Sequence, residues 1–145
     1  MKIRQILQGK AINALYSVSS DETVLDALKV MADKNIGAVL VVDEGRLTGI
    51  FSERDYARKV ILKGRHSNDT RVAEVMTSRV ITIEPEQRLD ECMEIMSERH
   101  IRHLPVMENG TLMGIISIND VVTAIMRDQK TRIDSLESYI SGSPY

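Results

Sequence analysis

The stretch Gly49-Ile-Phe-Ser-Glu-Arg-Asp55 has a second copy 65 positions later, Gly114-Ile-Ile-Ser-Ile-Asn-Asp120. Each copy has a glycine, two apolar residues, a serine and, three residues after the serine, an aspartate. An apolar run that leads into a serine with an acid three residues on is typical of the start of a helix. The pair therefore predicts a duplicated strand-to-helix turn, and it calls for a search for a longer repeat.

The duplication extends far beyond this turn when the chain is compared with itself at the same offset. Val18 then falls on Ile83, and no gap is needed between Val18 and Ile61. The first-copy residues that are identical in the second copy include Ile36, Gly45, Leu47, Gly49, Ile50, Ser52 and Asp55. The chain therefore contains two copies of one unit.

Each copy predicts the element order βαββα. A short extended piece, Tyr16–Val18 or Val80–Ile83, precedes a helix whose apolar residues recur at helical spacing and should face the core. These residues are Val24, Ala27, Leu28 and Met31 in the first copy and Leu89, Met93 and Met96 in the second. A hairpin follows, because Asn109-Gly110 can take the positive φ angles of a tight turn and Glu44-Gly45 is a weaker version of it. A closing helix then begins near Ser52 or Ser117.

Composition indicates a folded protein without a global attraction for polyanions. The 145 residues are 43% hydrophobic and 28% charged, with a net charge of −2, so no global positive field exists to attract nucleic acid or a membrane surface. One interlocked unit is the simpler expectation for this length. Cys92 is the single cysteine, which rules out an intrachain disulfide, and it is expected to fill the core. Without a signal-like or membrane-spanning run, we predict a cytoplasmic protein.

The polar, Gly-containing residues 62–72 mark a linker between the copies. We therefore predict a first repeat at 8–63, a second at 73–128 and a helical tail at 129–145. Ile133, Leu136, Tyr139 and Ile140 give that tail an apolar face. Because so short a helix is unstable alone in water, the tail is a candidate for a dimer or partner contact, with packing on the chain's own body as the alternative.

The duplicated turn could bind a ligand. Free backbone N–H groups and the positive end of the helix dipole lie beside the serine hydroxyl and favour an anion, and the aspartate can accept hydrogen bonds from both hydroxyls of a ribose. The alternative is a capping box that only stabilises the helix. Duplication, and Asp where a capping box prefers Glu or Gln, favour the ligand.

The copies differ at one informative place, where Ile101-Arg-His-Leu-Pro105 replaces Ile36-Gly-Ala-Val-Leu40. The second copy offers donor groups, whereas the first leaves backbone open to a flat base. Arg102 as a solvated charge is the alternative. His100 and His103 match no metal-binding motif, and no nucleophile motif is present, so neither metal binding nor catalysis is predicted.

The repeat, the paired Gly-x-x-Ser-x-x-Asp motifs and His103-Leu-Pro-Val106 resemble a tandem CBS-domain protein, also called a Bateman module. The resemblance implies an α/β (α+β) fold of two βαββα repeats packed about a pseudo-twofold axis, plus a C-terminal helix. It also implies a homodimer and adenosine ligands in two clefts, each taking its Ser and Asp from one repeat and its base-contacting backbone from the other. Relatives usually carry these repeats on an enzyme, channel or transporter, so an unknown effector protein is expected here.

The resemblance assigns two sites, which should differ in affinity or ligand. Site one would comprise Ser52, Arg54, Asp55, Arg58, Thr77, Ile81, Ile101, Arg102 and His103. Site two would comprise Tyr16, Ile36, Gly37, Ala38, Ser117, Asn119 and Asp120. The leading hypothesis is a regulatory module, not an enzyme, that binds AMP, ADP, ATP or NAD. A structural interaction module without a ligand is the alternative, and an enzyme acting on a nucleotide or a nucleic-acid binder ranks third.

Overall fold

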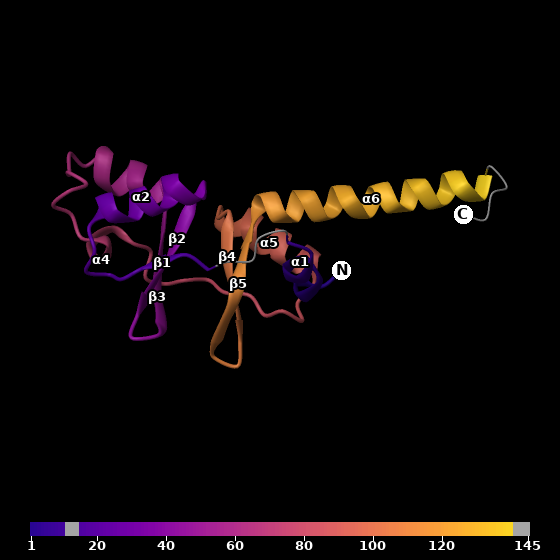
Figure 1. Cartoon of the computed structure of the whole chain (residues 1–145), viewed down its shortest axis with the longest axis horizontal. Coiled ribbons are helices and arrows are strands. Elements are labelled where there is room, and N and C mark those ends of the chain that lie inside the picture. The colour runs from indigo at the N-terminus through magenta and orange to yellow at the C-terminus, as the bar shows by residue number, and fades with distance from the viewer. Residues whose placement is uncertain (11–14, 141–145) are drawn as a thin grey trace. The chain divides into compact units, whose positions relative to one another are not determined.

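The computed structural model describes residues 1–10 and 15–140. The chain divides into two compact units, Ala14–Thr82 (the first-copy unit) and Met1–Asn13 with Ile83–Tyr145 (the second-copy unit). The expectation from chain length that the copies form one interlocked unit stays a prediction. Each unit contains one copy of the repeat and combines helices with strands, as the sequence predicts (Figure 1).

Both units contain a helix followed by a hairpin and a closing helix. The first-copy unit consists of β1 (Ser17–Val18), α2 (Val24–Lys34), β2 (Ala38–Asp43), β3 (Arg46–Ser52), α3 (Glu53–Asp55), the π-helix η1 (Tyr56–Ile61) and α4 (Val72–Val75). The second-copy unit consists of α1 (Ile3–Gly9), α5 (Leu89–Arg99), β4 (His103–Glu108), β5 (Thr111–Ser117) and α6 (Ile118–Ile140).

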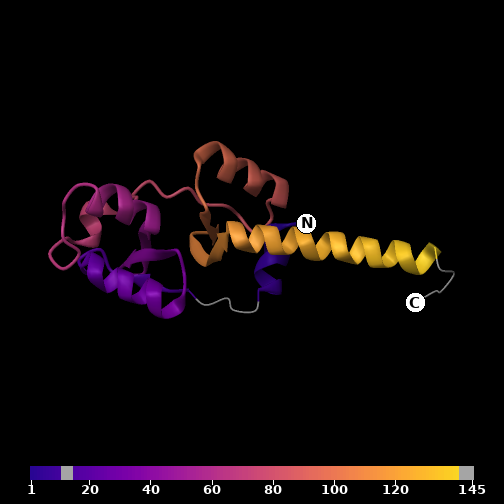
Figure 2. The same ribbon diagram turned by 90° about the horizontal axis from the view of Figure 1, so that it is seen from above.

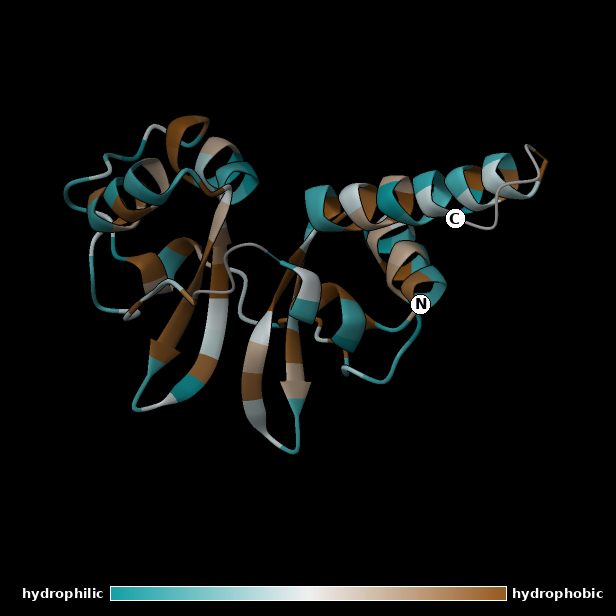
Figure 3. Cartoon of the chain, turned by 45° about the vertical axis from the view of Figure 1, so that its right-hand side comes forward, coloured by the Kyte–Doolittle hydropathy of each residue, from teal (hydrophilic) through white to brown (hydrophobic). Residues whose placement is uncertain are grey.

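The two hairpins have the same construction. Glu44 and Gly45 have φ angles of 49° and 76°, and Asn109 and Gly110 have 52° and 78°, so both predicted tight turns are confirmed. A register shift follows at the same place in each hairpin, between Val41 and Val42 and between Val106 and Met107. Brown hydrophobic residues fill the strands and teal polar residues occupy the tips (Figure 3).

The sheets differ by one strand. In the first-copy unit β1 pairs with β2 in parallel, and the Leu40 N–H donates to the Tyr16 carbonyl at 3.2 Å. Pro105 occupies the position of Leu40 in the second copy and has no N–H to donate. The predicted strand at Val80–Ile83 is accordingly reduced to an isolated bridge between Ile83 and Val106.

The predicted apolar stripes form most of each core. Val24, Ala27 and Met31 of α2 are buried, whereas in α5 the buried residues are Cys92 and Met96. Met93 is exposed, so its predicted place in the core is wrong, because the stripe of α5 runs through Cys92. Cys92 stands where the first copy has Ala27, and burial raises the pKa of its thiol to about 11, which keeps the thiol protonated and unreactive.

The two short helices that precede the copies, α1 and α4, are exchanged between them. α4 precedes the second copy but belongs to the first-copy unit, where the Val72 N–H donates to the Glu22 carbonyl at 2.9 Å. α1 precedes the first copy but belongs to the second-copy unit, where the Ile3 N–H donates to the Gln87 carbonyl at 2.9 Å. Each helix thereby completes the core of the other copy.

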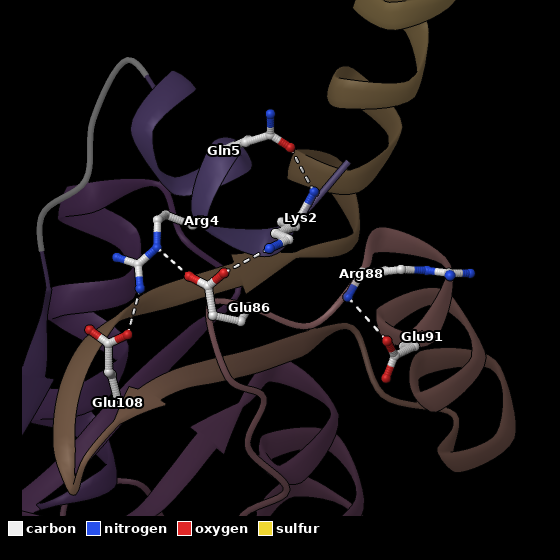
Figure 4. Close-up of polar contacts among 7 residues, drawn as sticks. All are labelled: Lys2, Arg4, Gln5, Glu86, Arg88, Glu91 and Glu108. Atoms are coloured by element: carbon white, nitrogen blue, oxygen red, sulfur yellow. Dashed lines mark hydrogen bonds and ion pairs between the residues drawn. The ribbon is translucent and has the colours of Figure 1, made fainter.

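Side-chain contacts fasten α1 to the second-copy unit (Figure 4). Arg4 Nε lies 2.6 Å and Lys2 Nζ lies 3.0 Å from the two carboxylate oxygens of Glu86, and Arg4 also pairs with Glu108. The hydrogen bond from Arg4, followed by that from Lys2, lowers the pKa of Glu86 below its ordinary value. These exposed pairs add orientation more than stability.

The closing helix of the second copy and the predicted tail are one element, α6, which runs without a break through Ile140. The prediction of a separate tail helix is therefore wrong as to its start, and residues 141–145 of the predicted tail lie outside the described residues. No glycine or proline occurs between Ile118 and Ile140 to end the helix. The C-terminal half of α6 runs clear of α1 and α5 (Figures 1 and 2). Of the helices in the described ranges, none is long and apolar enough to cross a membrane.

Candidate functional site

The first Ser-x-x-Asp turn joins β3 to α3. Ser52 is extended, with φ −119° and ψ 167°, and its Oγ accepts a hydrogen bond from the Asp55 N–H at 3.2 Å. Asp55 Oδ2 in turn accepts from the Ser52 N–H and from the Ser52 hydroxyl, both at 3.0 Å. The capping box of the alternative hypothesis is therefore present in full.

Asp55 also has partners that a capping box does not require. Its Oδ1 accepts a hydrogen bond from the Thr77 hydroxyl at 3.1 Å and lies 3.0 Å from Lys59 Nζ. The residue is only 7% exposed, and burial of a carboxylate is tolerated only with such a set of donors. The Lys59 side chain is 44% exposed, so its contact is the one that a ligand hydroxyl could most readily replace.

Thr77 reaches Asp55 because the segment after α4 lies against β3. Thr77 and Ile50 exchange two backbone hydrogen bonds of 2.9 and 3.0 Å. The neighbouring glycine of the motif makes this approach possible, since a Cβ on Gly49 would lie 2.6 Å from Met76 Sδ and 3.0 Å from the Thr77 carbonyl oxygen. The three motif residues therefore contribute to one local structure: the serine and the aspartate form the capping box, and the glycine lets Thr77 approach the aspartate.

The helix that follows Asp55 is a π-helix, η1. The Leu62 N–H donates to the Ala57 carbonyl at 3.1 Å, which is the i to i+5 pattern. π-Helical turns are rare in proteins as a whole, and many of those that occur lie at functional sites. Arg54 and Arg58, the predicted phosphate contacts, are exposed on either side of Asp55.

The second Ser-x-x-Asp turn repeats the capping box and changes the cation. The Ser117 N–H donates to Asp120 Oδ2 at 2.8 Å, and the Asp120 N–H donates to Ser117 Oγ at 3.2 Å. Lys10, directly after α1, lies 3.1 Å from Asp120 Oδ2 and donates to the Ile115 carbonyl at 2.8 Å. Lys10, Asp120 and Arg127 border a hollow of about 550 Å³ within this unit.

The predicted base-contacting segments lie beside the turn of their own copy. Ala38 pairs with Ser52, and the Gly37 carbonyl accepts from the N–H after Ser52 at 3.1 Å. His103 pairs with Ser117 in the same way, and the Arg102 carbonyl accepts from the Ile118 N–H at 2.9 Å. Each copy thus presents its turn and its predicted base-contacting segment side by side.

The histidine that invited a metal interpretation has a structural explanation. His100 ends α5 in the left-handed conformation with φ 54°, as Asn35 ends α2 with φ 54°. Within residues 1–10 and 15–140, no group of three or more His, Cys, Asp or Glu side chains could hold a metal ion.

The structure brings Ser52, Asp55 and Thr77 together in one unit and Ser117 and Asp120 in the other. Both composite sites draw on residues of both units, so each stays a prediction. The residues of site one in the second-copy unit are Ile101, Arg102 and His103, and those of site two in the first-copy unit are Tyr16, Ile36, Gly37 and Ala38. Arg54, Arg58, Ile81 and Asn119 keep their assignment on the same terms.

Sequence reasoning missed the two lysines that contact the aspartates. Lys59 lies one helical turn after Asp55, so the i, i+4 spacing could have revealed it. Lys10 is far from Asp120 in the sequence, at the end of α1. A second, weaker repeat could have shown that α1 belongs to the duplicated unit. The stretch Lys2-Ile-Arg-Gln-Ile-Leu7 matches Arg71-Val-Ala-Glu-Val-Met76 in character at an offset of 69 rather than 65.

Comparison with known proteins identifies the class. The sequence profile of the CBS domain matches residues 9–62 and again residues 72–127. The duplicated unit, its hairpins and its Ser-x-x-Asp turns are therefore those of a CBS-domain pair, and the chain belongs to the CBS domain family.

Individual relatives agree. A mitochondrial CBS domain-containing protein of Arabidopsis thaliana is 40% identical over 129 residues, which are 86% of this chain and 63% of that protein. A solved structure of a protein with CBS domains from Burkholderia ambifaria is 49% identical, with a TM-score of 0.86 over 89% of this chain and 96% of that one. The CBS domain pair of protein MJ0100, solved with 5-methylthioadenosine and S-adenosyl-L-methionine, is 25% identical, with a TM-score of 0.77 over 88% of this chain and 98% of that one.

Proposed function

We propose that this CBS-domain pair is a regulatory module that binds adenosine-containing ligands at its two Ser-x-x-Asp turns. The observation that carries the proposal is Asp55, a nearly buried carboxylate at a helix start, ringed by two hydroxyls and by the exposed cation of Lys59. A carboxylate held there suits the two hydroxyls of a ribose. The MJ0100 pair in complex with two adenosine derivatives supports the same ligand class.

AMP, ADP, ATP and NAD are the ligands that we propose within this class. The pair of sites would be composite, as the sequence predicts, with Arg54 and Arg58 directed to a phosphate in site one. Site two lacks both, because Asn119 and Thr123 stand where Arg54 and Arg58 do, and Lys10 is the cation nearest to its aspartate. The sites should therefore prefer ligands of different charge.

Regulation would follow from differential affinity. A ligand shifts a conformational equilibrium only if it binds one arrangement of the chain more tightly than another. We propose that this shift is passed to an effector protein and that the chain itself is not catalytic. We retain the cytoplasm as the proposed location, although the Arabidopsis relative is mitochondrial by name.

Thermal unfolding against AMP, ADP, ATP, NAD, S-adenosylmethionine and 5-methylthioadenosine tests the proposal, with GMP as the control for the base. A ligand at a hundred times its Kd adds about 2.7 kcal/mol to the free energy of unfolding. A rise in Tm with adenine compounds and none with GMP is expected. An unchanged Tm with every compound at millimolar concentration would refute ligand binding.

Substitution of the aspartates separates the ligand role from the capping role. Asp55→Asn and Asp120→Asn each retain one side-chain oxygen that can accept the hydrogen bond from the serine N–H, but they replace the second oxygen with a donor. We expect each variant to lose one of the two sites by calorimetry while keeping its helix and most of its Tm. Unchanged stoichiometry in both variants would show that the sites are assigned wrongly.

A second candidate function has an observation in its favour, because both capping boxes are formed. In this alternative the chain is a structural interaction module, and the aspartates only stabilise helices. A lower Tm of Asp55→Ala and Asp120→Ala without ligand is expected under both functions, so the adenine compounds decide between them: in this alternative they would leave the Tm of the wild type unchanged.

A further inference from the structure

α6 carries a regular apolar seam on its exposed face. The residues of this seam follow one another at alternating spacings of four and three, as in the a and d positions of a heptad repeat. They are Val122, Met126, Gln129, Ile133, Leu136 and Ile140. Five of the six are apolar, and the pattern spans nearly three heptads.

The chain's own unit does not cover this seam. Val121 is buried and Ala124 and Ile125 are half-buried, which marks the face of α6 that packs inward. By contrast Met126 is 64% exposed and Leu136 is 60% exposed. The hydrophobic bands recur along the part of α6 that runs clear of α1 and α5 (Figure 3).

The residue types in the seam indicate how many helices pair. Ile133 and Ile140 occupy a positions and Leu136 a d position, and β-branched residues at a with leucine at d favour two parallel helices. Gln129 is the polar d residue, and a single polar residue in a seam fixes the register at some cost in stability.

The charges beside the seam specify the direction. Arg132 lies at a g position and Glu137 at the e position five residues on, so in a parallel pair each Arg132 meets Glu137 of the second copy. An antiparallel pair with the same six seam residues overlapped would instead place Arg132 against Arg132 and Lys130 against Lys130. Like charges at such positions are destabilising.

We propose that α6 pairs with α6 of a second copy of this chain as a parallel two-stranded coiled coil. We assign the seam to a second copy of this chain because its apolar residues match in register when two copies of α6 lie parallel, and Arg132 of each copy then meets Glu137 of the other. The seam spans fewer than three heptads and contains one polar residue, so the dimer is expected to form and dissociate with protein concentration.

Analytical ultracentrifugation of the full chain across concentrations tests the proposal. The sedimenting mass should double at high concentration, and Leu136→Asp and Ile133→Asp should each leave a monomer. Ser135→Asp adds the same charge outside the seam and should still dimerise. Circular dichroism confirms that each variant keeps its helix. A wild-type monomer at every concentration, as expected if the seam serves another protein, or a dimer that survives both seam substitutions would overturn the proposal.

Charge exchange tests the direction. Glu137→Arg should weaken the dimer because it places two arginines together, and Arg132→Glu combined with Glu137→Arg should restore it. In a Cys92→Ala background, Leu136→Cys should form an interchain disulfide under mild oxidation and Ser135→Cys should not. Failure of the double variant to recover, together with equal cross-linking of both cysteines, would exclude the parallel pair.

Discussion

The two Ser-x-x-Asp turns share their capping hydrogen bonds and differ in what else reaches the aspartate. Asp55 is contacted by the Thr77 hydroxyl and by Lys59 of its own closing helix, whereas Asp120 is contacted by Lys10 from the N-terminal segment. Lys59 is 44% exposed and Lys10 only 17%. The same motif therefore lies beside an exposed lysine in one copy and a largely buried lysine in the other.

The difference has a simple origin in sequence. Ala124 stands where Lys59 does, so the closing helix of the second copy has no lysine one turn after its aspartate. The closing helices differ as well, since η1 is a short π-helix and α6 continues as a long α-helix. A motif match alone thus does not predict how readily each carboxylate could take up a ligand.

The largest expected effect is on stability without ligand. Asp55→Ala removes four contacts of a nearly buried carboxylate and should lower the free energy of unfolding by about 3 kcal/mol, and Asp120→Ala by about 1.5 kcal/mol. Urea denaturation of both variants measures the difference. Equal losses would mean that Thr77 and Lys59 together add no more to Asp55 than Lys10 adds to Asp120.

The next largest effect concerns the approach of Thr77. Gly49→Ala would place a Cβ 3.0 Å from the Thr77 carbonyl oxygen and closer still to Met76, so it should cost about 2 kcal/mol by overpacking. Faster hydrogen exchange of the Thr77 amide should accompany the loss. Gly9→Ala is the control, because nothing beyond its chain neighbours and the backbone of its own helix lies within 4 Å of its Cβ position. Similar stability of the two variants would contradict the close approach.

The smallest expected effect is a pH dependence of the free energy of unfolding. It concerns only the second Ser-x-x-Asp turn, because Glu86 contacts α1 and the lysine after α1 contacts Asp120. Glu86 has a lowered pKa, chiefly through its hydrogen bond from Arg4, so its stabilising contribution is present above the pKa of the unfolded chain, about 4.3. That contribution is lost as the pH falls through the lower folded pKa. Glu86→Gln should therefore flatten the acid side of the stability curve and loosen α1, while Glu94→Gln, an exposed change on α5, should not. Lys10 directly follows α1. Identical acid profiles in wild type and Glu86→Gln would show that Glu86 does not hold α1, and with it Lys10, in place.

Most of the fold could be predicted from the repeat, for physical reasons that particular residues show. Asn109-Gly110 and Glu44-Gly45 fix the hairpins because their φ angles are restricted to turns. Pro105 could also have predicted the missing strand pairing, since the loss of an N–H is visible in the sequence. The error at Met93 arose because Cys92 and Met93 are neighbours, and either of them gives helical spacings of three and four between Leu89 and Met96.

The candidate site was less accessible to prediction. Ser52, Asp55, Ser117 and Asp120 follow from the motif, but Lys10 depends on a tertiary contact between distant parts of the chain. The gapless comparison also missed α1, because the offset of the repeat changes from 65 to 69 there. The π-helix after Asp55 has no sequence signal that we recognise.

The exchange of α1 and α4 sets an order of events during synthesis. The first-copy unit is one continuous stretch that ends at Thr82, so a ribosome releases all of it early. The second-copy unit joins two segments that the whole first-copy unit separates in the sequence, so Met1–Lys10 must wait until residues 83–120 have been synthesised. Because closing so long a loop is slow, α1 stays without its partners for longer than any element of the first-copy unit.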